Sequence, residues 1–175
     1  MTQLGEILAR AVRDRFALTR DELVLLLELD DPGARRDLYA AAYEVKVRHA
    51  GKVVSLRGII EMGNVCAKNC FYCGIRRDNR ALDRFQLDEA AVLEAVKRNL
   101  DLHYGSLVLQ SGEIESEAHT VFIERLLRAI AARAGDTLGI TLSLGEQNAE
   151  TYARWRKAGA HRYLLRIETS NPRLY

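Results

Sequence analysis

From residue 53 to the end of the chain, short apolar runs typical of strands alternate with longer amphipathic runs typical of helices. This alternation constrains the fold more than any other feature of the sequence, because repeated strand and helix units of this length form a parallel sheet with right-handed crossovers. Gly135 and Gly159 fall where two of the helices should end, which supports the boundaries. The pattern predicts strands at residues 53–61, 106–109, 138–142 and 162–166, and helices at residues 89–102, 118–133 and 149–158.

The first fifty residues predict helices. Apolar side chains at helical spacing predict one helix over residues 1–15, and capping patterns that begin at Thr19 and Asp31 predict two more. These helices carry no chemical motif. The sequence therefore predicts two domains: residues 1–50, a helical cap at one end of a barrel, and residues 51–175, the barrel core, incomplete at its C-terminal end.

Polar or reactive residues lie at or near the end of every predicted strand. In a β/α barrel this rim is where catalytic groups converge, although the groups are far apart in sequence. An open doubly wound sheet would also bind ligands at its carboxyl ends, but the glycine-rich first turn of a dinucleotide fold is absent. The predicted fold class is therefore α/β, a partial (β/α) barrel of the TIM type with N-terminal helices. The rim residues are the cysteines after the first strand, residues 110–113, Thr141, Ser143, Glu146 and residues 166–169.

All three cysteines of the chain, Cys66, Cys70 and Cys73, fall within eight residues. Three thiolates at this spacing can each hold one iron of a four-iron four-sulfur cube, which leaves the fourth iron open to a small molecule. The alternative is a structural zinc site, which normally needs four protein ligands. The nearest histidines in sequence, His49 and His103, lie well outside the cysteine segment.

The cysteine spacing, with the aromatic Tyr72 just before the third cysteine, resembles the cluster loop of the radical S-adenosylmethionine (SAM) superfamily. The resemblance implies two cofactors, a 4Fe-4S cluster and S-adenosyl-L-methionine. In that family the methionyl amine and carboxylate of SAM chelate the open iron. An electron from the reduced cluster then cleaves SAM to methionine and a 5'-deoxyadenosyl radical.

Two further groups fit this resemblance, and each has a structural alternative. Ser111-Gly112-Glu113 resembles the glycine-glycine-glutamate motif that binds the methionyl amine, but it could equally be a turn with a helix cap. Arg166 and Glu168 share one face of the predicted fourth strand, where they form either a structural ion pair or SAM contacts. In the second interpretation Arg166 binds the SAM carboxylate, and Glu168 binds a ribose hydroxyl or the amine.

Several linked segments from about Leu18 to the last residue, among them residues 57–61, 73–79, 109–113 and 140–146, resemble the HydE family of iron-iron hydrogenase maturases. The resemblance implies a role in building the dithiomethylamine bridge of the hydrogenase cluster, on an organometallic precursor made by a partner maturase. It assigns the cysteines to the cluster, and Ser111, Gly112, Arg166 and Glu168 to SAM. It places Tyr72 near the adenine and Thr141 beside the substrate cavity; Thr141 is otherwise a satisfied core hydroxyl.

The chain ends where a helix after the fourth strand would begin, so we expect a truncated fragment that is poorly active alone. A net charge of +2 from scattered Lys and Arg residues predicts no nucleic-acid partner, and no apolar run is long enough for a membrane span. The expected partners are a small-molecule or organometallic substrate, hydrogenase maturation proteins, and a reductant such as ferredoxin or flavodoxin, in the cytoplasm. The alternatives are a biotin synthase-like or methylornithine synthase-like enzyme, or a non-catalytic iron-sulfur module.

Overall fold

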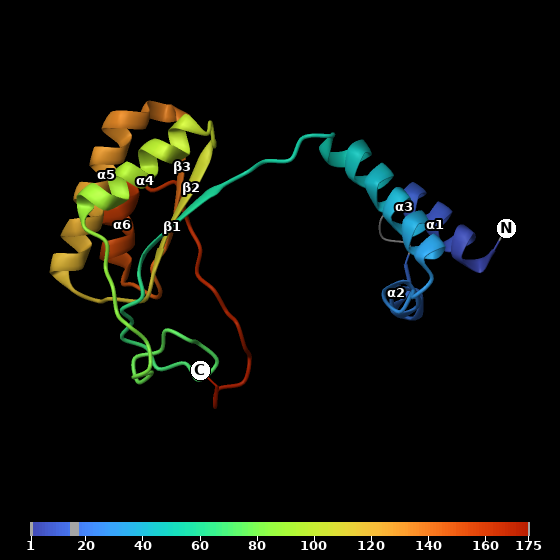
Figure 1. Cartoon of the computed structure of the whole chain (residues 1–175), viewed down its shortest axis with the longest axis horizontal. Helices are drawn as coiled ribbons and strands as arrows, with labels where there is room; N and C mark the ends of the chain where they lie inside the picture. Colours follow the sequence, from blue (N-terminus) through green and yellow to red (C-terminus); the bar gives the residue numbers. More distant parts are fainter. Residues whose placement is uncertain (1, 15–17, 175) are drawn as a thin grey trace. The chain divides into compact units, whose positions relative to one another are not determined.

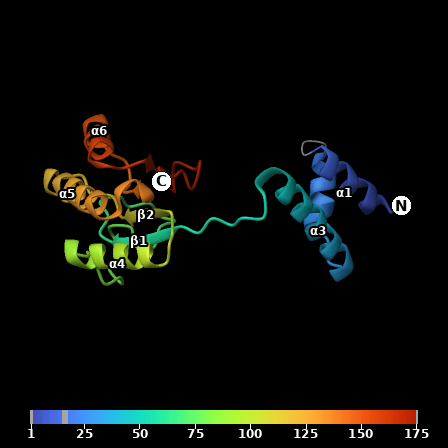
Figure 2. The ribbon, with the colours of Figure 1, turned by 90° about the horizontal axis from the view of Figure 1, so that it is seen from above.

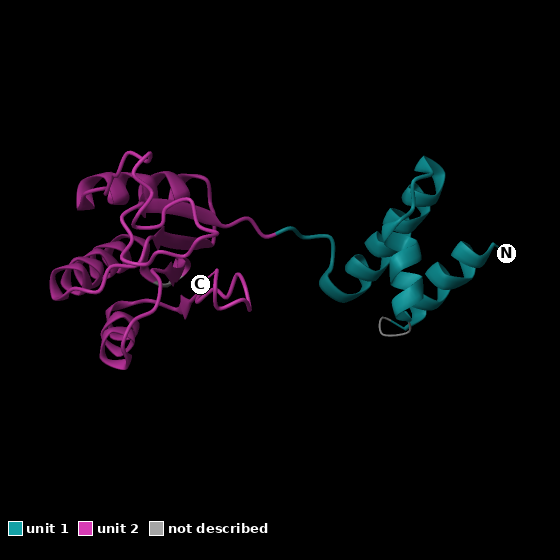
Figure 3. Ribbon diagram, turned by 90° about the horizontal axis from the view of Figure 1, so that it is seen from below, with its two compact units in different colours: residues 1–54 teal, residues 55–175 magenta. Residues whose placement is uncertain are grey.

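The computed structural model describes residues 2–14 and 18–174. They form two compact units, residues 1–54 and residues 55–175, which are coloured separately in Figure 3. Each unit is described by itself below.

The first unit consists of three helices, each of which begins at a side-chain cap. Thr2 accepts a hydrogen bond from Gly5 N, Thr19 forms a capping box with Glu22, and Asp31 accepts from Ala34 N. The three predicted helices are therefore present. Met1 and Arg15, the ends of the first predicted helix, lie outside the described residues. The helices are α1 (Gln3–Arg13), α2 (Arg20–Leu27) and α3 (Pro32–Ala50).

The second unit contains a parallel four-stranded sheet in which the strands lie in chain order. Each strand except the last is followed by a helix, as Figure 1 shows, so the α/β fold with β-α repeats is confirmed. The strands are β1 (Gly58–Gly63), β2 (Ser106–Ser111), β3 (Gly139–Ser143) and β4 (Arg162–Tyr163). The helices are α4 (Glu89–Asp101), α5 (Glu117–Ala134) and α6 (Ala149–Ala158), with a short 3-10 helix at Gly135–Thr137.

The three helices cover one face of this sheet, as the two views in Figures 1 and 2 agree. Every second strand residue points into the apolar layer between sheet and helices. Leu107 and Leu109 of β2 and Leu142 of β3 are at most 1% exposed, and they pack with buried residues of all three helices. The opposite face of the sheet carries the polar side chains of Glu61, Gln110, Thr141 and Ser143 together with Ile59 and Val108.

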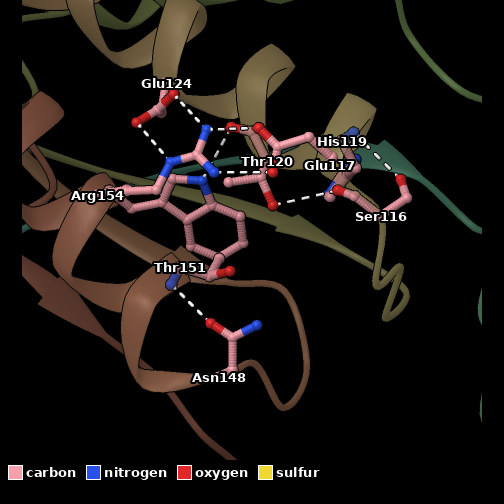
Figure 4. Close-up of polar contacts among 9 residues, drawn as sticks. Ser116, Glu117, His119, Thr120, Glu124, Asn148, Thr151 and Arg154 are labelled. Carbon is pink, nitrogen blue, oxygen red and sulfur yellow. Dashed lines mark hydrogen bonds and ion pairs between the residues drawn. The ribbon is translucent and has the colours of Figure 1, made fainter.

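Polar contacts join α5 to α6, and Figure 4 shows them. The Arg154 guanidinium contacts the carboxylates of Glu117 (2.8 Å) and Glu124 (3.0 Å), and Trp155 Nε1 donates to the Thr120 carbonyl at 3.1 Å. Arg154 lowers the pKa of both glutamates below the usual carboxyl range, first by hydrogen bonding. His119 is buried beside Trp155, and burial lowers its pKa below 6.5. These contacts hold α6 against α5, and they therefore also help to position β4, the strand that follows α6.

The predicted first strand began too early. Residues 53–57 are not in a strand, and Val53 and Val54 are more than 70% exposed. The physical reason is pairing: Gly58 lies opposite Leu107, one residue after β2 begins, so residues 53–56 have no strand beside them. β-Branched composition was not enough to form a strand without a partner.

The predicted fourth strand extended too far. β4 ends at Tyr163, and residues 164–166 lie outside any strand. Its ladder with β3 consists of Thr141 opposite Arg162 and Leu142 opposite Tyr163. β3 ends one residue later, and Gly145, at φ +76°, turns the chain away from the sheet. Arg166 and Glu168 therefore lie in an extension after the strand rather than on it.

In the part of the chain that the structure describes, no helix is both long enough and apolar enough to cross a membrane.

Candidate cluster and SAM site

A cavity of about 220 Å³ lies at the carboxyl end of the sheet and brings together segments as far apart in sequence as Cys66 and Glu168. Its wall comes from the cysteine loop after β1, the turn after β2, the end of β3 and the extension after β4. The structure thus gathers eight of the nine predicted site residues at one cavity. They are Cys66, Cys70, Tyr72, Cys73, Ser111, Gly112, Arg166 and Glu168.

The cysteine loop between β1 and α4 is irregular, and two side chains hold its shape. Asn64, which is buried, donates to the Asp83 carbonyl at 2.8 Å and accepts from Phe85 N at 2.8 Å, so the two ends of the loop are joined. The Arg84 guanidinium donates to the carbonyls of Asn64, Ile75 and Arg76 at 2.5 to 2.8 Å. The loop therefore has a defined shape that does not depend on an apolar core of its own.

The donor set of this loop fits a four-iron cluster. Its three cysteines are free, partly exposed thiols that line the same cavity. Among the residues that the structure describes, no three His, Cys, Asp or Glu side chains converge on one point as a single metal ion requires. In a four-iron cube each of the three thiolates binds a separate iron. The Glu113 N–H donates to Cys66 Sγ at 3.4 Å, which is the kind of contact that tunes a cluster ligand.

The turn after β2 lies directly against this loop because Gly112 has no side chain. A Cβ at Gly112 would overlap the carbonyl oxygen of Val65 and lie 2.7 Å from Cys66 Cβ. Gly112 is therefore required for the close approach of two backbones. The neighbouring Ser111 also lines the cavity, and its hydroxyl donates to the Gly112 carbonyl at 2.8 Å.

Lys68, two residues after Cys66, joins two acidic side chains at the cavity wall. Its Nζ lies 3.1 Å from Glu146 Oε2 and 3.3 Å from Glu113 Oε1. The carboxylates of Glu146, first, and of Glu113 raise the pKa of Lys68 above its ordinary value, so the ammonium stays charged. A positive charge thus sits at the wall of the cavity, next to the cysteines.

Polar side chains form a row that leads from β1 to the extension after β4. Gln110 Nε2 donates to Glu61 Oε1 at 2.7 Å, and Arg166 donates to Gln110 Oε1, also at 2.7 Å. Arg166 Nε lies 3.9 Å from Glu168 Oε1, and both side chains are about half exposed. The two charged groups therefore lie close enough to interact, as the structural interpretation expects, while both still border the cavity.

Thr141 is the predicted site residue that does not line this cavity. It alternates with the buried Ile140 and Leu142, so it lies on the same face of β3 as Ser143, which does line the cavity. Thr141 lies two residues deeper along that face. Its role beside a substrate stays a prediction.

Lys68 and Arg84 were not predicted as members of the site. Gln110 was placed at the rim with residues 110–113, but no task was given to it. Lys68 had a usable signal, since it lies between two of the identified cysteines. Arg84 had no such signal, because it donates to backbone carbonyls of an irregular loop, and no periodic sequence pattern predicts the path of such a loop.

Three cysteines in one loop, facing strand-end groups across the mouth of a parallel β/α sheet, define a class of iron-sulfur protein that opens its cluster to a small molecule. The family model described as the radical SAM superfamily matches residues 60–175. The chain belongs to this superfamily, whose members bind a 4Fe-4S cluster and S-adenosylmethionine. The family predicted from the cysteine loop is therefore confirmed.

The curated proteins that resemble this chain include a hydrogenase maturase and a biotin synthase. Over 170 residues, 97% of the chain, it is 39% identical to the [FeFe] hydrogenase maturase subunit HydE of Thermotoga maritima. Over 166 residues it is 30% identical to a biotin synthase of Staphylococcus aureus. The matches cover 47% and 49% of those proteins, so the chain spans about half the length of the curated relatives it matches. The resemblance to the HydE family is thus confirmed over nearly all of this chain.

Solved structures support the fold. A crystal structure of methylornithine synthase superposes with a TM-score of 0.74 at 25% identity, covering 95% of this chain and 49% of that one. A crystal structure of the [FeFe]-hydrogenase maturase HydG gives a TM-score of 0.71 at 22% identity, covering 96% and 38%. The second likeness concerns the fold alone. The predicted partial barrel of the radical SAM type agrees with both.

Proposed function

We propose that this chain carries the cofactor-binding part of a radical SAM enzyme that acts in the maturation of [FeFe] hydrogenase, as its HydE relative does by name. The observation that carries the proposal is the convergence of the three cysteines with the ends of β2, β3 and β4 on one cavity. A protein that only stores a cluster has no need for a wall of charged and hydroxyl side chains opposite it. The cluster and SAM, when bound, supply an electron and a carbon radical.

Each residue of the cavity has a proposed task. Cys66, Cys70 and Cys73 hold the cluster, and Tyr72, which is partly exposed at the cavity, offers a face on which adenine can stack. The remaining wall groups are supported by position and chemistry. They are Ser111 and Gly112 for the methionyl end of SAM, Arg166 for its carboxylate, and Glu168 for a ribose hydroxyl or the amine. Thr141, which lies deeper on the same sheet face and outside this wall, is proposed for the substrate.

The polar row supports the task of Arg166. A guanidinium that already donates to Gln110 keeps its other N–H groups for a carboxylate, and a forked contact of that kind is strong and directional. Glu168 balances the charge at 3.9 Å. We further propose a small or organometallic substrate, hydrogenase maturation proteins as partners, ferredoxin or flavodoxin as the source of electrons, and a cytoplasmic setting.

The metal content of the protein tests the cluster directly. Protein isolated and reconstituted without oxygen is expected to hold about four irons and four sulfides per chain. Cys70→Ser is expected to lose most of both, whereas Ser116→Ala, which removes only a helix cap, is expected to keep them. One zinc per chain with no labile sulfide would overturn the proposal in favour of a structural metal site.

The 30% identity to biotin synthase supports a second candidate, a biotin synthase-like enzyme. Two hosts separate the candidates: one lacks its HydE maturase and the other requires biotin. Recovery of hydrogen evolution in the first host supports the hydrogenase role. Growth of the second host without biotin, with no hydrogen evolution in the first, would replace it.

A further inference from the structure

Glu113, in the turn after β2, contacts two other segments of the cavity wall, the cysteine loop and the loop after β3. Its backbone N–H donates to Cys66 Sγ at 3.4 Å, and its carbonyl accepts from Ala67 N at 2.8 Å. Its side chain reaches the other way, where Oε2 accepts from the Glu146 N–H at 2.6 Å. One residue at the end of β2 therefore holds the cysteine loop with its backbone and the loop after β3 with its carboxylate.

The Glu113 carboxylate is committed to this position. The side chain is 5% exposed, and a buried carboxylate is costly unless a cation and hydrogen bonds compensate it. Lys68 supplies the cation at 3.3 Å, and its ammonium also reaches Glu146 at 3.1 Å. The three side chains of Lys68, Glu113 and Glu146, here called the three-loop clamp, join the loops that follow β1, β2 and β3.

Two glycines leave room for the three-loop clamp. A Cβ on Gly145 would overlap the Glu113 side chain, and Gly145 also has a φ of +76°. A Cβ on Gly112 would overlap the cysteine loop itself. The backbone at Gly145 is thus shaped around the Glu113 side chain, and the missing side chain at Gly112 lets the turn that carries Glu113 lie against the cysteine loop. Both features indicate that the position of Glu113 is built into the fold.

We propose that the three-loop clamp is a positioning device: it holds the cysteine loop in its cluster-binding shape before iron arrives, and it keeps the Glu113 N–H directed at the Cys66 sulfur. The inference rests on the proposed function. The motif that Ser111-Gly112-Glu113 resembles binds the methionyl amine of SAM; here Glu113 Oε2 accepts from the Glu146 N–H, and Oε1 pairs with the Lys68 ammonium at 3.3 Å without a hydrogen bond of its own among the residues that the structure describes. Hydrogen bonds to cluster sulfurs change the reduction potential, so the clamp also sets the potential of the cluster.

Hydrogen exchange on the full chain without cluster tests the first half of the proposal. Lys68→Met is expected to speed amide exchange of residues 64–80 by about tenfold, while α5 exchanges as in the native protein. Lys68→Arg keeps the charge and is expected to stay near the native rate. Arg77→Met is the matched control, because it removes an exposed cation of the same loop that pairs with Asp78. Native exchange of residues 64–80 in Lys68→Met would overturn the proposal.

A double variant covers the case in which Lys68→Met unfolds the whole unit and also speeds exchange in α5. Lys68→Met/Glu113→Gln leaves no unpaired buried charge and keeps an acceptor for the Glu146 N–H. It is expected to fold and still to exchange residues 64–80 faster than the native chain. Native exchange in the double variant would overturn the proposal.

The reduction potential of the reconstituted cluster tests the second half. Lys68→Met is expected to shift the midpoint to a more negative value, because the sulfur loses a fixed donor and the site loses a cation, while Lys68→Arg and Arg77→Met stay near native. An unchanged potential in Lys68→Met would overturn this half. If no cluster forms in the native chain but exchange still responds to Lys68, the proposed function fails and the clamp stands.

Discussion

Leu109 and Gln110 are neighbours on β2, yet they lie on opposite faces of the sheet. Leu109 is 0% exposed and packs beneath the helices, whereas Gln110 lines the cavity and bridges Glu61 to Arg166. Residues of β3 divide in the same way, with Leu142 in the core and Ser143 at the cavity. Alternate positions of one strand therefore serve separate purposes. The side chains of one face stabilise the unit, and those of the other face form the cavity wall.

Truncating each of these two side chains tests whether the two faces differ in their contribution to stability, and it has the largest expected effect. Leu109→Ala is expected to lower the free energy of unfolding by about 2 to 5 kcal/mol, because it leaves a cavity in a packed layer. Gln110→Ala is expected to change it by about 0.5 kcal/mol or less, since its side chain packs against no core. Urea titration followed by the fluorescence of Trp155, the chain's single tryptophan, reports on this unit. Equal losses in both variants would mean that the two faces are not separate.

A glycine at the rim of the cavity and a glycine in an ordinary loop are expected to differ in how much an added side chain destabilises the unit. Gly135 and Gly145 both have positive φ, but a Cβ at Gly135 meets nothing within 4 Å, whereas at Gly145 it overlaps Glu113. Gly135→Ala is expected to cost about 1 kcal/mol and Gly145→Ala about 2 to 3 kcal/mol. The same urea titration measures both. Similar costs would show that the Glu113 side chain moves aside easily.

The pH dependence of the melting temperature tests the face of the sheet that the helices cover, with a smaller expected effect. Burial lowers the pKa of His119, so the folded unit favours the neutral imidazole. Its contribution to stability is therefore present above pH 6.5 and is lost as the pH falls below that value. We expect the melting temperature of the native chain to fall between pH 7.5 and pH 5.5 more than that of His119→Gln. The groups that face it, Phe122 and Trp155, do not titrate in this range.

The smallest effect is expected at the surface contact between α5 and α6. Arg154 lowers the pKa of Glu117 and Glu124, so the stability that this contact contributes is present above about pH 4.5 and is lost as the pH falls below it. Arg154→Met should melt below the native chain at pH 7, and the gap should narrow at pH 3.5. A gap that is independent of pH would show that Arg154 acts by packing alone.

Much of the fold followed from local patterns. The helix predicted at residues 149–158 is α6, because Asn148 caps its start and Gly159 ends it, and both signals are local. The errors occurred where a strand needed a partner: residues 53–57 precede the pairing of β1 with β2, and residues 164–166 continue past the end of β3. Composition does not record where a neighbouring strand begins or ends.

The site was predictable in its chemistry and less so in its contacts. The cysteines, Ser111 and Arg166 carry spacing or strand-end signals, so sequence alone placed them on one rim. The pairing of Lys68 with Glu113 and Glu146 joins residues 45 and 78 positions apart, and no periodicity encodes such a contact. Arg166 and Glu168 were expected on a strand, yet they lie after it, so their nearness depends on the path of the extension.

The central claim is that the open face holds a cluster with one iron free for SAM. Electron paramagnetic resonance of the anaerobically reconstituted and reduced chain, recorded with and without SAM, tests it most directly. The account predicts the signal of a reduced four-iron cube whose shape changes when SAM is added, and no such change in Arg166→Ala. A cube signal that is identical with and without SAM, or the absence of any cube, would contradict it.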